Sequence, residues 1–190
     1  MDNLALQCRC GQVSGRAIKV TPAAATRVVC YCRDCQRFAN WLDAAEQTLD
    51  SWGGTDIFQL PPARLQIHQG HEHIRCLRLS EKGLYRWYAG CCKTPIGNSL
   101  KPSVPLIGLI SSFVSDSQAE LKTGPVCARV NLGGATAQIP SSLISAAPSR
   151  SYLLRLLGKM ASWKLRGLGR PHPFFAPRGE PISPPQIIES

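Results

Sequence analysis

The sharpest signal in this sequence spans residues 30–35 and reads Cys-Tyr-Cys-Arg-Asp-Cys. Alternate residues of an extended strand project from the same face, so Cys30 and Cys32 can converge on one ion. The turn that follows brings Cys35 back towards them. Three thiolates leave the fourth position of a tetrahedral zinc for water, a substrate or another protein ligand. The segment therefore predicts a three-cysteine zinc site, and its cysteines are also the candidate catalytic residues.

Two arginines lie close to these cysteines in the sequence, Arg33 and Arg37. A nearby positive charge favours the thiolate form that binds metal and can also attract an anion. We therefore expect Arg33 and Arg37 to contact an anionic ligand or cofactor at this site.

Four more cysteines form two further tight groups, Cys8 with Cys10 and Cys91 with Cys92. Gly11 lets the backbone turn beside the first pair without a Cβ clash. Zinc needs four ligands, so joining the two pairs would connect the first strand to a segment some eighty residues away. Neighbouring side chains of an extended chain point in opposite directions, which favours Cys92 over Cys91 as a ligand.

Length and composition indicate a globular protein with one well-buried domain. Of the 190 residues, 44% are hydrophobic and 18% are charged, and no apolar run approaches the roughly 18 residues of a membrane span. The first six residues show no basic segment followed by an apolar one, so we expect no secretory signal and a cytoplasmic location. Reducing conditions there leave the nine cysteines free to bind metal. Cys76 and Cys127, which stand alone, are expected to be small buried apolar residues.

The pattern of residues predicts a fold that is mainly β with short helices. Strands are expected over 12–20, 55–59, 64–68, 74–79 and 84–89, and the last two form a hairpin in which Gly83 takes the turn. A short helix is expected over 36–42, and 43–49 extends it or forms a second helix. A zinc-binding domain is thus expected over 1–130, followed by a basic extension over 131–190 that packs on it.

The extension is expected to contain an amphipathic helix over 152–166 and a proline-rich extended tail. Apolar residues form one face of this helix and mostly basic residues the other: Leu153, Leu156, Leu157 and Met160 against Arg155, Lys159, Ser162 and Arg166. We expect the leucine face to pack on the domain and the basic face to be solvated. The net charge of +10 also allows an anionic partner, either a nucleic acid or a membrane surface.

Four elements in order carry a resemblance to a known family: Cys-Arg-Cys-Gly at 8–11, Cys-Tyr-Cys-Arg-Asp-Cys-Gln at 30–36, Gly-Gly-Thr at 53–55 and Cys-Lys-Thr-Pro at 92–95. Over roughly residues 4–98 the chain resembles the glutathione-dependent formaldehyde-activating enzyme and centromere protein V family. The resemblance implies a β-tent fold with one structural zinc, matched here by Cys8, Cys10 and Cys92. It also implies a second site for glutathione adducts of aldehydes, matched by Cys30, Cys32 and Cys35.

The chain departs from the family pattern Cys-x-x-Cys-Gly-Thr-Pro, because residues 89–95 read Ala-Gly-Cys-Cys-Lys-Thr-Pro. Either Cys91 replaces the cysteine lost at Ala89, or three sulfurs act with another ligand, or the site is empty. Lys93 stands where the family has a glycine, the residue that most easily adopts the left-handed backbone of the turn after a zinc-binding cysteine. The chain therefore resembles a divergent branch of the family.

Two functions from different classes fit the sequence. The first is a zinc-dependent carbon–sulfur lyase or adduct-forming enzyme, resembling S-(hydroxymethyl)glutathione synthase, with glutathione as co-substrate. The second is a non-enzymatic zinc scaffold whose basic tail binds an anionic partner such as nucleic acid. His68, His71 and His73 are expected to line a loop rather than to bind a metal.

Overall fold

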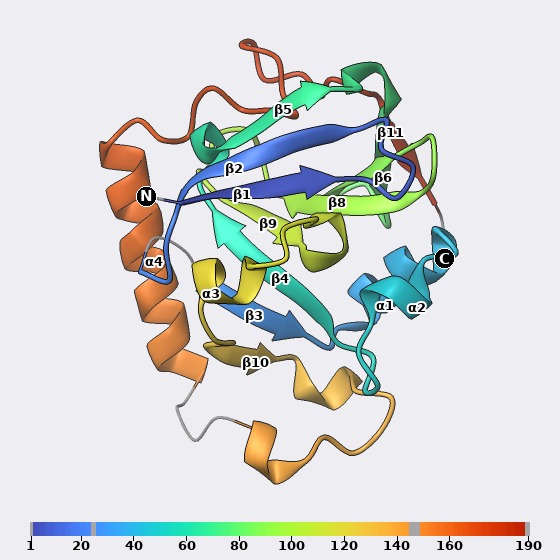
Figure 1. Ribbon diagram of the computed structural model, residues 1–190, viewed down its shortest axis with the longest axis vertical. Helices are drawn as coiled ribbons and strands as arrows, with labels where there is room; N and C mark the ends of the chain where they lie inside the picture. The colour runs from blue at the N-terminus through green and yellow to red at the C-terminus, as the bar shows by residue number, and fades with distance from the viewer. Residues whose placement is uncertain (1, 24–25, 145–148, 189–190) are drawn as a thin grey trace.

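Two β-sheets, one of three strands and one of eight, form the framework of the protein (Figure 1). A computed structural model describes residues 2–23, 26–144 and 149–188. The small sheet has the order β1-β2-β5, with bounds Asp2–Gln7, Ser14–Val20 and Leu65–Gln69. The large sheet has the order β10-β3-β4-β9-β8-β7-β6-β11, with bounds Ala128–Val130, Thr26–Cys30, Thr55–Leu60, Ile107–Ile110, Thr94–Ser99, Tyr85–Ala89, Ile74–Arg78 and Pro185–Ile187. The expected mainly-β fold is confirmed.

Helices are short apart from the last one. They are α1 (Arg33–Trp41), α2 (Ala45–Thr48), α3 (Ala119–Thr123) and α4 (Ser149–Leu165). Single 3₁₀ turns lie at Pro62–Arg64, His71–His73, Ser111–Phe113, Leu132–Gly134 and Ser141–Leu143. Within the described residues, no helix combines the length and apolar character required to cross a membrane.

The main core lies between the two sheets. In β1 the buried positions alternate, so Leu4 and Leu6 face the large sheet while their neighbours are exposed. Trp87 of β7 is fully buried in the same cluster, and its indole nitrogen donates to the Ser99 hydroxyl at 2.8 Å. The predicted hairpin is confirmed, because β6 and β7 pair antiparallel from Ile74 to Leu77.

The C-terminal tail contributes two buried aromatic side chains to the main core. Phe174 is fully buried and stacks on Trp87 with 4.8 Å between ring centroids, and Phe175 meets the same indole edge-on. Further along the tail, β11 pairs parallel with β6 at the edge of the large sheet. The last residues of the chain therefore help to hold the hairpin strands.

Helix α4 packs on the body through a different face from the one expected. Tyr152, Leu156 and Trp163 form the packed face: Leu156 and Trp163 are buried, and the Tyr152 hydroxyl donates to the side-chain oxygen of Gln59 at 3.0 Å. This orientation corrects two expectations. Leu153 and Leu157, expected to pack on the domain, are exposed. Lys159, expected to face solvent, donates to the carbonyl of Ala23 at 2.7 Å.

Truncating Phe174 should show how much the tail contributes to stability. Phe174→Ala removes a fully buried ring from its stack on Trp87, so we expect a loss of about 3–5 kcal/mol in the free energy of unfolding. Urea denaturation followed by tryptophan fluorescence measures it. Ile182→Ala, on an exposed side chain of the same tail, is the control and should change stability by less than about 1 kcal/mol. Equal stability of both variants would contradict the described packing.

Candidate metal centres

The structure brings seven of the nine cysteines together in two groups that could each hold a metal ion. Cys8, Cys10, Cys91 and Cys92 form the four-cysteine group, and Cys30, Cys32 and Cys35 form the three-cysteine group. Within each group the sulfur atoms all lie within 4.8 Å of one another. All nine cysteines are free thiols.

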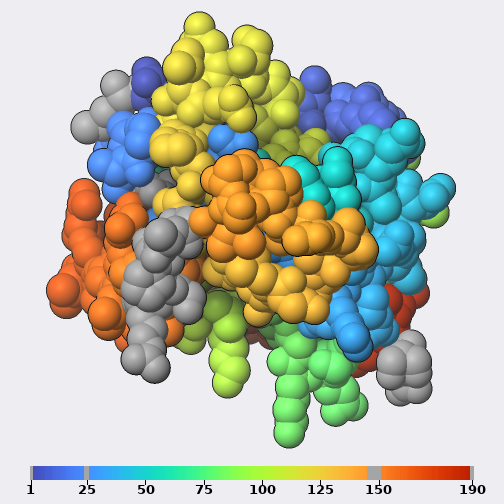
Figure 2. Space-filling view, turned by 90° about the horizontal axis from the view of Figure 1, so that it is seen from below, coloured from blue at the N-terminus to red at the C-terminus, as the bar shows by residue number. Residues whose placement is uncertain are grey.

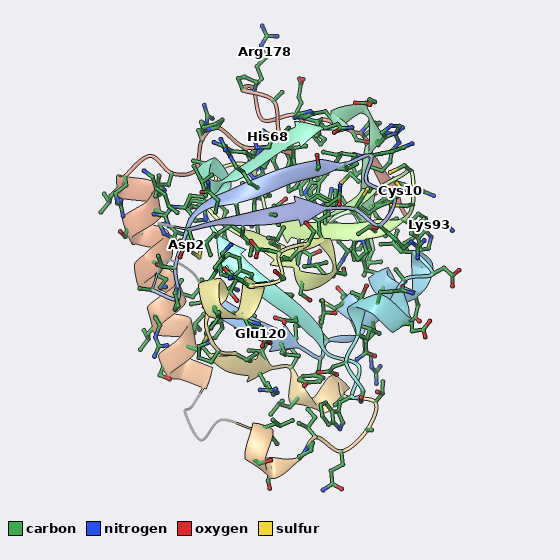
Figure 3. All side chains as sticks on the ribbon, in the orientation of Figure 1. Asp2, Cys10, His68, Lys93, Glu120 and Arg178 are labelled. Atoms are coloured by element: carbon green, nitrogen blue, oxygen red, sulfur yellow. The ribbon has the colours of Figure 1, made fainter. Side chains whose placement is uncertain are left out.

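The four-cysteine group connects two segments that are far apart in the sequence. Cys8 and Cys10 follow β1, and the other pair lies in the turn between β7 and β8; Figure 3 shows Cys10 and Lys93 at the same edge of the molecule. The sulfur of Cys91 lies 3.4 Å from that of Cys10 and 3.9 Å from those of Cys8 and Cys92. Sulfurs bound at about 2.3 Å to a tetrahedral zinc lie about 3.8 Å apart, so the donors and their spacing fit zinc.

Adjacent cysteines can both reach this group because the chain turns there. Residues 90–93 form a turn between the paired residues Ala89 and Thr94, so the extended geometry that would point Cys91 and Cys92 apart does not apply. Lys93, which stands where the family that the sequence resembles has a glycine, adopts a left-handed backbone with φ of 58°. A lysine keeps the turn at a cost of about 1 kcal/mol. The structure thus places Cys91 as well as Cys92 beside Cys8 and Cys10.

Hydrogen bonds from the surrounding backbone and side chains orient these sulfurs. The Val13 amide donates to the Cys8 sulfur at 3.2 Å, and Thr94 bonds the Cys92 sulfur at 3.1 Å while accepting from the Arg9 amide. Burial raises the pKa of Cys8. Burial also acts to raise the pKa of Cys92, but hydrogen bonds from Thr94 and from backbone amides outweigh it and lower this pKa to about 6. One thiolate is therefore available at neutral pH even before a metal binds.

The three-cysteine group is built where β3 meets α1. Cys30 is the last residue of β3, and Cys32 caps α1 by accepting from the Cys35 amide at 3.4 Å. Asn131, on the loop after β10, donates to the Cys30 sulfur at 3.3 Å. The three sulfurs lie together as expected, but by a different local path. The strand ends at Cys30, Cys32 is the N-cap, and Arg33 and Asp34 form the start of α1 instead of a separate turn.

The three thiols titrate as one unit. Hydrogen bonds from Cys32 and Cys35 lower the pKa of Cys30 to about 2. The same bonds to Cys30 raise the pKa of Cys32 and of Cys35, because their protons are held in them. The group therefore holds one negative charge readily, and further ionisation requires a cation among the sulfurs.

A cavity of about 260 Å³ opens directly onto the three-cysteine group. Arg86 and Asn98 line it together with apolar side chains: Ile57, Leu84, Leu100 and Leu106. Arg86 is only 1% exposed, and one of its terminal nitrogens lies 3.9 Å from the Cys35 sulfur and 3.4 Å from the Asn98 side-chain oxygen. Its other terminal nitrogen lies 3.5 Å from Asp34, and its Nε has no partner among the described residues. A buried cation thus faces the sulfurs.

Sequence reasoning missed Arg86 because residues 84–89 were interpreted only as a core strand. The signal was a charged residue inside an apolar strand, since such a residue is rarely buried without a partner. Arg33 is exposed and Arg37 is half-buried, and neither is among the residues that line the cavity. The expectation that these two arginines bind an anion stays a prediction.

The remaining candidates lie outside both groups. His71 and His73 belong to a 3₁₀ turn before β6, and His68 is exposed at the end of β5, so the described histidines join neither sulfur group. Cys76 is buried, as expected. Cys127 is only half-buried, and its sulfur donates to the carbonyl of Arg27 at 2.9 Å.

Comparison with known proteins gives a family but no annotated relative. A search of curated proteins found no match. The family model described as "Family of unknown function (DUF6151)" matches residues 1–184, which include both cysteine groups, the cavity and helix α4. The chain therefore belongs to the DUF6151 family.

Proposed function

We propose that this protein binds two zinc ions, a structural one in the four-cysteine group and a reactive one in the three-cysteine group. We further propose that it makes or breaks carbon–sulfur bonds in adducts of aldehydes with a small thiol such as glutathione. One observation carries the proposal: three thiols and the buried Arg86 face the same cavity. The resemblance to the glutathione-dependent formaldehyde-activating enzymes supports the choice of substrate.

The four-cysteine group suits a structural role because its donor set is complete. Four sulfurs satisfy a tetrahedral zinc and leave no position for a substrate. The group joins the end of β1 to the turn between β7 and β8, and binding an ion there adds its free energy to folding.

The three-cysteine group suits a reactive role because it supplies one sulfur fewer and borders a cavity. When bound there, zinc would supply a Lewis acid with a coordination position open to sulfur or oxygen. Arg86 offers a buried positive charge that attracts an anionic substrate and offsets the charge of the thiolates. The apolar walls around Ile57 and Leu106 limit the access of water.

The proposed step is an addition and its reverse, without any change in oxidation state. The sulfur of the small thiol bonds to the aldehyde carbon, and the carbon–oxygen double bond becomes a single bond. The oxygen takes up one proton and the thiol loses one, so the number of protons does not change. Asn98, next to Arg86 in the wall, provides an amide that can hold the adduct's polar groups. Reversal breaks the carbon–sulfur bond and releases both reactants.

A purely structural role explains the three-cysteine group less well. A structural zinc site closes its fourth position with a protein ligand, and no fourth cysteine, histidine or carboxylate joins this group among the described residues. The carboxylate that pairs with the buried Arg86 is that of Asp34, which lies 3.5 Å away and is 58% exposed, so the charge of Arg86 is only weakly balanced by it. Both features are expected of a binding site for an anionic ligand.

Exchanging one cysteine in each group should separate the two roles. We expect the wild-type protein to hold two zinc equivalents. Cys10→Ser should lower the melting temperature by roughly 10 °C or more, because it opens the link between β1 and the β7–β8 turn. Cys35→Ser should keep the fold and lose at most one zinc. Zinc counts and thermal melts measure both effects, with Cys127→Ser, outside both groups, as the control. Collapse of Cys35→Ser with tolerance of Cys10→Ser would reverse the assignment.

The activity can be tested directly by exchange NMR of glutathione with formaldehyde. The zinc-loaded protein should speed the exchange between the free thiol and its adduct, and Cys35→Ser should abolish the effect. Arg86→Met should slow it by about tenfold or more, because a charged hydrogen-bond donor facing the site is lost. Arg37→Met, outside the cavity lining, is the comparison. An exchange rate equal to that in buffer alone would refute the enzymatic role and leave the zinc scaffold as the explanation.

A further inference from the structure

Helix α4 carries a second apolar face whose side chains are half-exposed or more. Its exposed leucines form what we call the leucine stripe: Leu153, Leu154, Leu157 and Leu165, with exposed fractions of 52%, 71%, 51% and 89%. Leu154, Leu157 and Leu165 follow a spacing of three and eight residues, which places them along one side of a helix. Figure 2 shows α4 on the surface at one edge of the molecule.

The leucine stripe is separate from the face that holds α4 in place. Leu156 and Trp163 are buried, and the helix is also tied to the body by Tyr152. The stripe therefore contributes little to folding, while it exposes large apolar side chains to water at a cost. A continuous exposed apolar face of this kind marks an interaction surface.

The stretch of sequence that contains α4 is rich in positive charge and lacks acidic residues. From Leu121 to Gly179 the chain has nine Lys and Arg and no Asp or Glu. On α4, Arg155 and Lys164 are exposed, and the exposed Arg166 directly follows the helix. The helix is 17 residues long, or about 25 Å, so it carries both exposed leucines and exposed cations.

We propose that α4 docks on an anionic lipid surface, lying parallel to it with the leucine stripe inserted at the boundary of headgroups and acyl chains. This arrangement buries the leucines and pairs the cations with lipid phosphates and carboxylates. Two other occupants fit less well. A second copy would bring like charges together, and a nucleic acid would contact the cations but leave the leucines in water. The proposal is independent of the zinc sites.

Vesicle flotation with the full-length protein tests this proposal. We expect binding to vesicles of phosphatidylcholine mixed with phosphatidylserine, weak binding to phosphatidylcholine alone, and weakening as salt increases. The double variant Leu154→Gln/Leu157→Gln should lower the partition coefficient by about tenfold or more, because two leucines no longer insert. Both side chains are exposed, so the fold should be retained. Leu121→Gln/Leu132→Gln, at exposed leucines outside both α4 and the lining of the three-cysteine cavity, is the matched control and should bind as the wild type does.

Three outcomes would overturn the proposal. The first is no binding to anionic vesicles. The second is binding that Leu154→Gln/Leu157→Gln leaves unchanged, which would show that the attraction is purely electrostatic. The third is a dimer in the absence of vesicles that this double variant disperses, which would assign the stripe to a second copy. Lys164→Gln/Arg166→Gln separates the charge contribution, and we expect it to weaken binding about tenfold at low salt.

Discussion

The meeting of Cys8 and Cys10 with Cys91 and Cys92 is the constraint on which the rest of the structure depends. It joins the end of the small sheet to a turn of the large sheet across more than eighty residues of sequence, at sulfur spacings that fit one tetrahedral ion. A connection of that length is entropically costly to close, and a metal ion can offset the cost with its binding free energy. The two sheets also pack on each other around Trp87, on which Phe174 of the C-terminal tail stacks.

The two cysteine groups differ in ways that give them different uses under the proposed function. The four-cysteine group has a full set of sulfurs and lies at a strand end and a turn. The three-cysteine group has one ligand fewer, a cavity beside it and a buried cation in the cavity wall. The second set combines the parts that zinc-assisted chemistry on an anionic thiol requires, namely an open position, a charge that attracts the substrate, and walls that limit water. If α4 docks on lipid as proposed, the proposed chemistry would take place at a membrane surface.

Much of the framework could be predicted because it follows from local patterns. Alternation and turn residues located the β6–β7 hairpin, and clustered cysteines located both sulfur groups. Other features depend on contacts that no local pattern contains. The three-residue edge strands β10 and β11 exist only because β3 and β6 offer a partner, and Arg86 becomes a site residue only once α1 lies beside β7. Lys93 adopts a left-handed backbone in the turn between β7 and β8, which its residue type does not predict. Helix α4 packs through Tyr152, Leu156 and Trp163, a face that the pattern of leucines did not single out.

The most direct test of the central claim is X-ray absorption spectroscopy at the zinc edge on the fully loaded protein. One closed and one open site predict an average first shell of about 3.5 sulfur atoms near 2.3 Å and about half a lighter ligand at shorter distance. Adding glutathione should raise the sulfur count towards four as its thiolate replaces the lighter ligand. Four sulfurs per zinc before any thiol is added, with no change afterwards, would show that both sites are closed and would contradict the account.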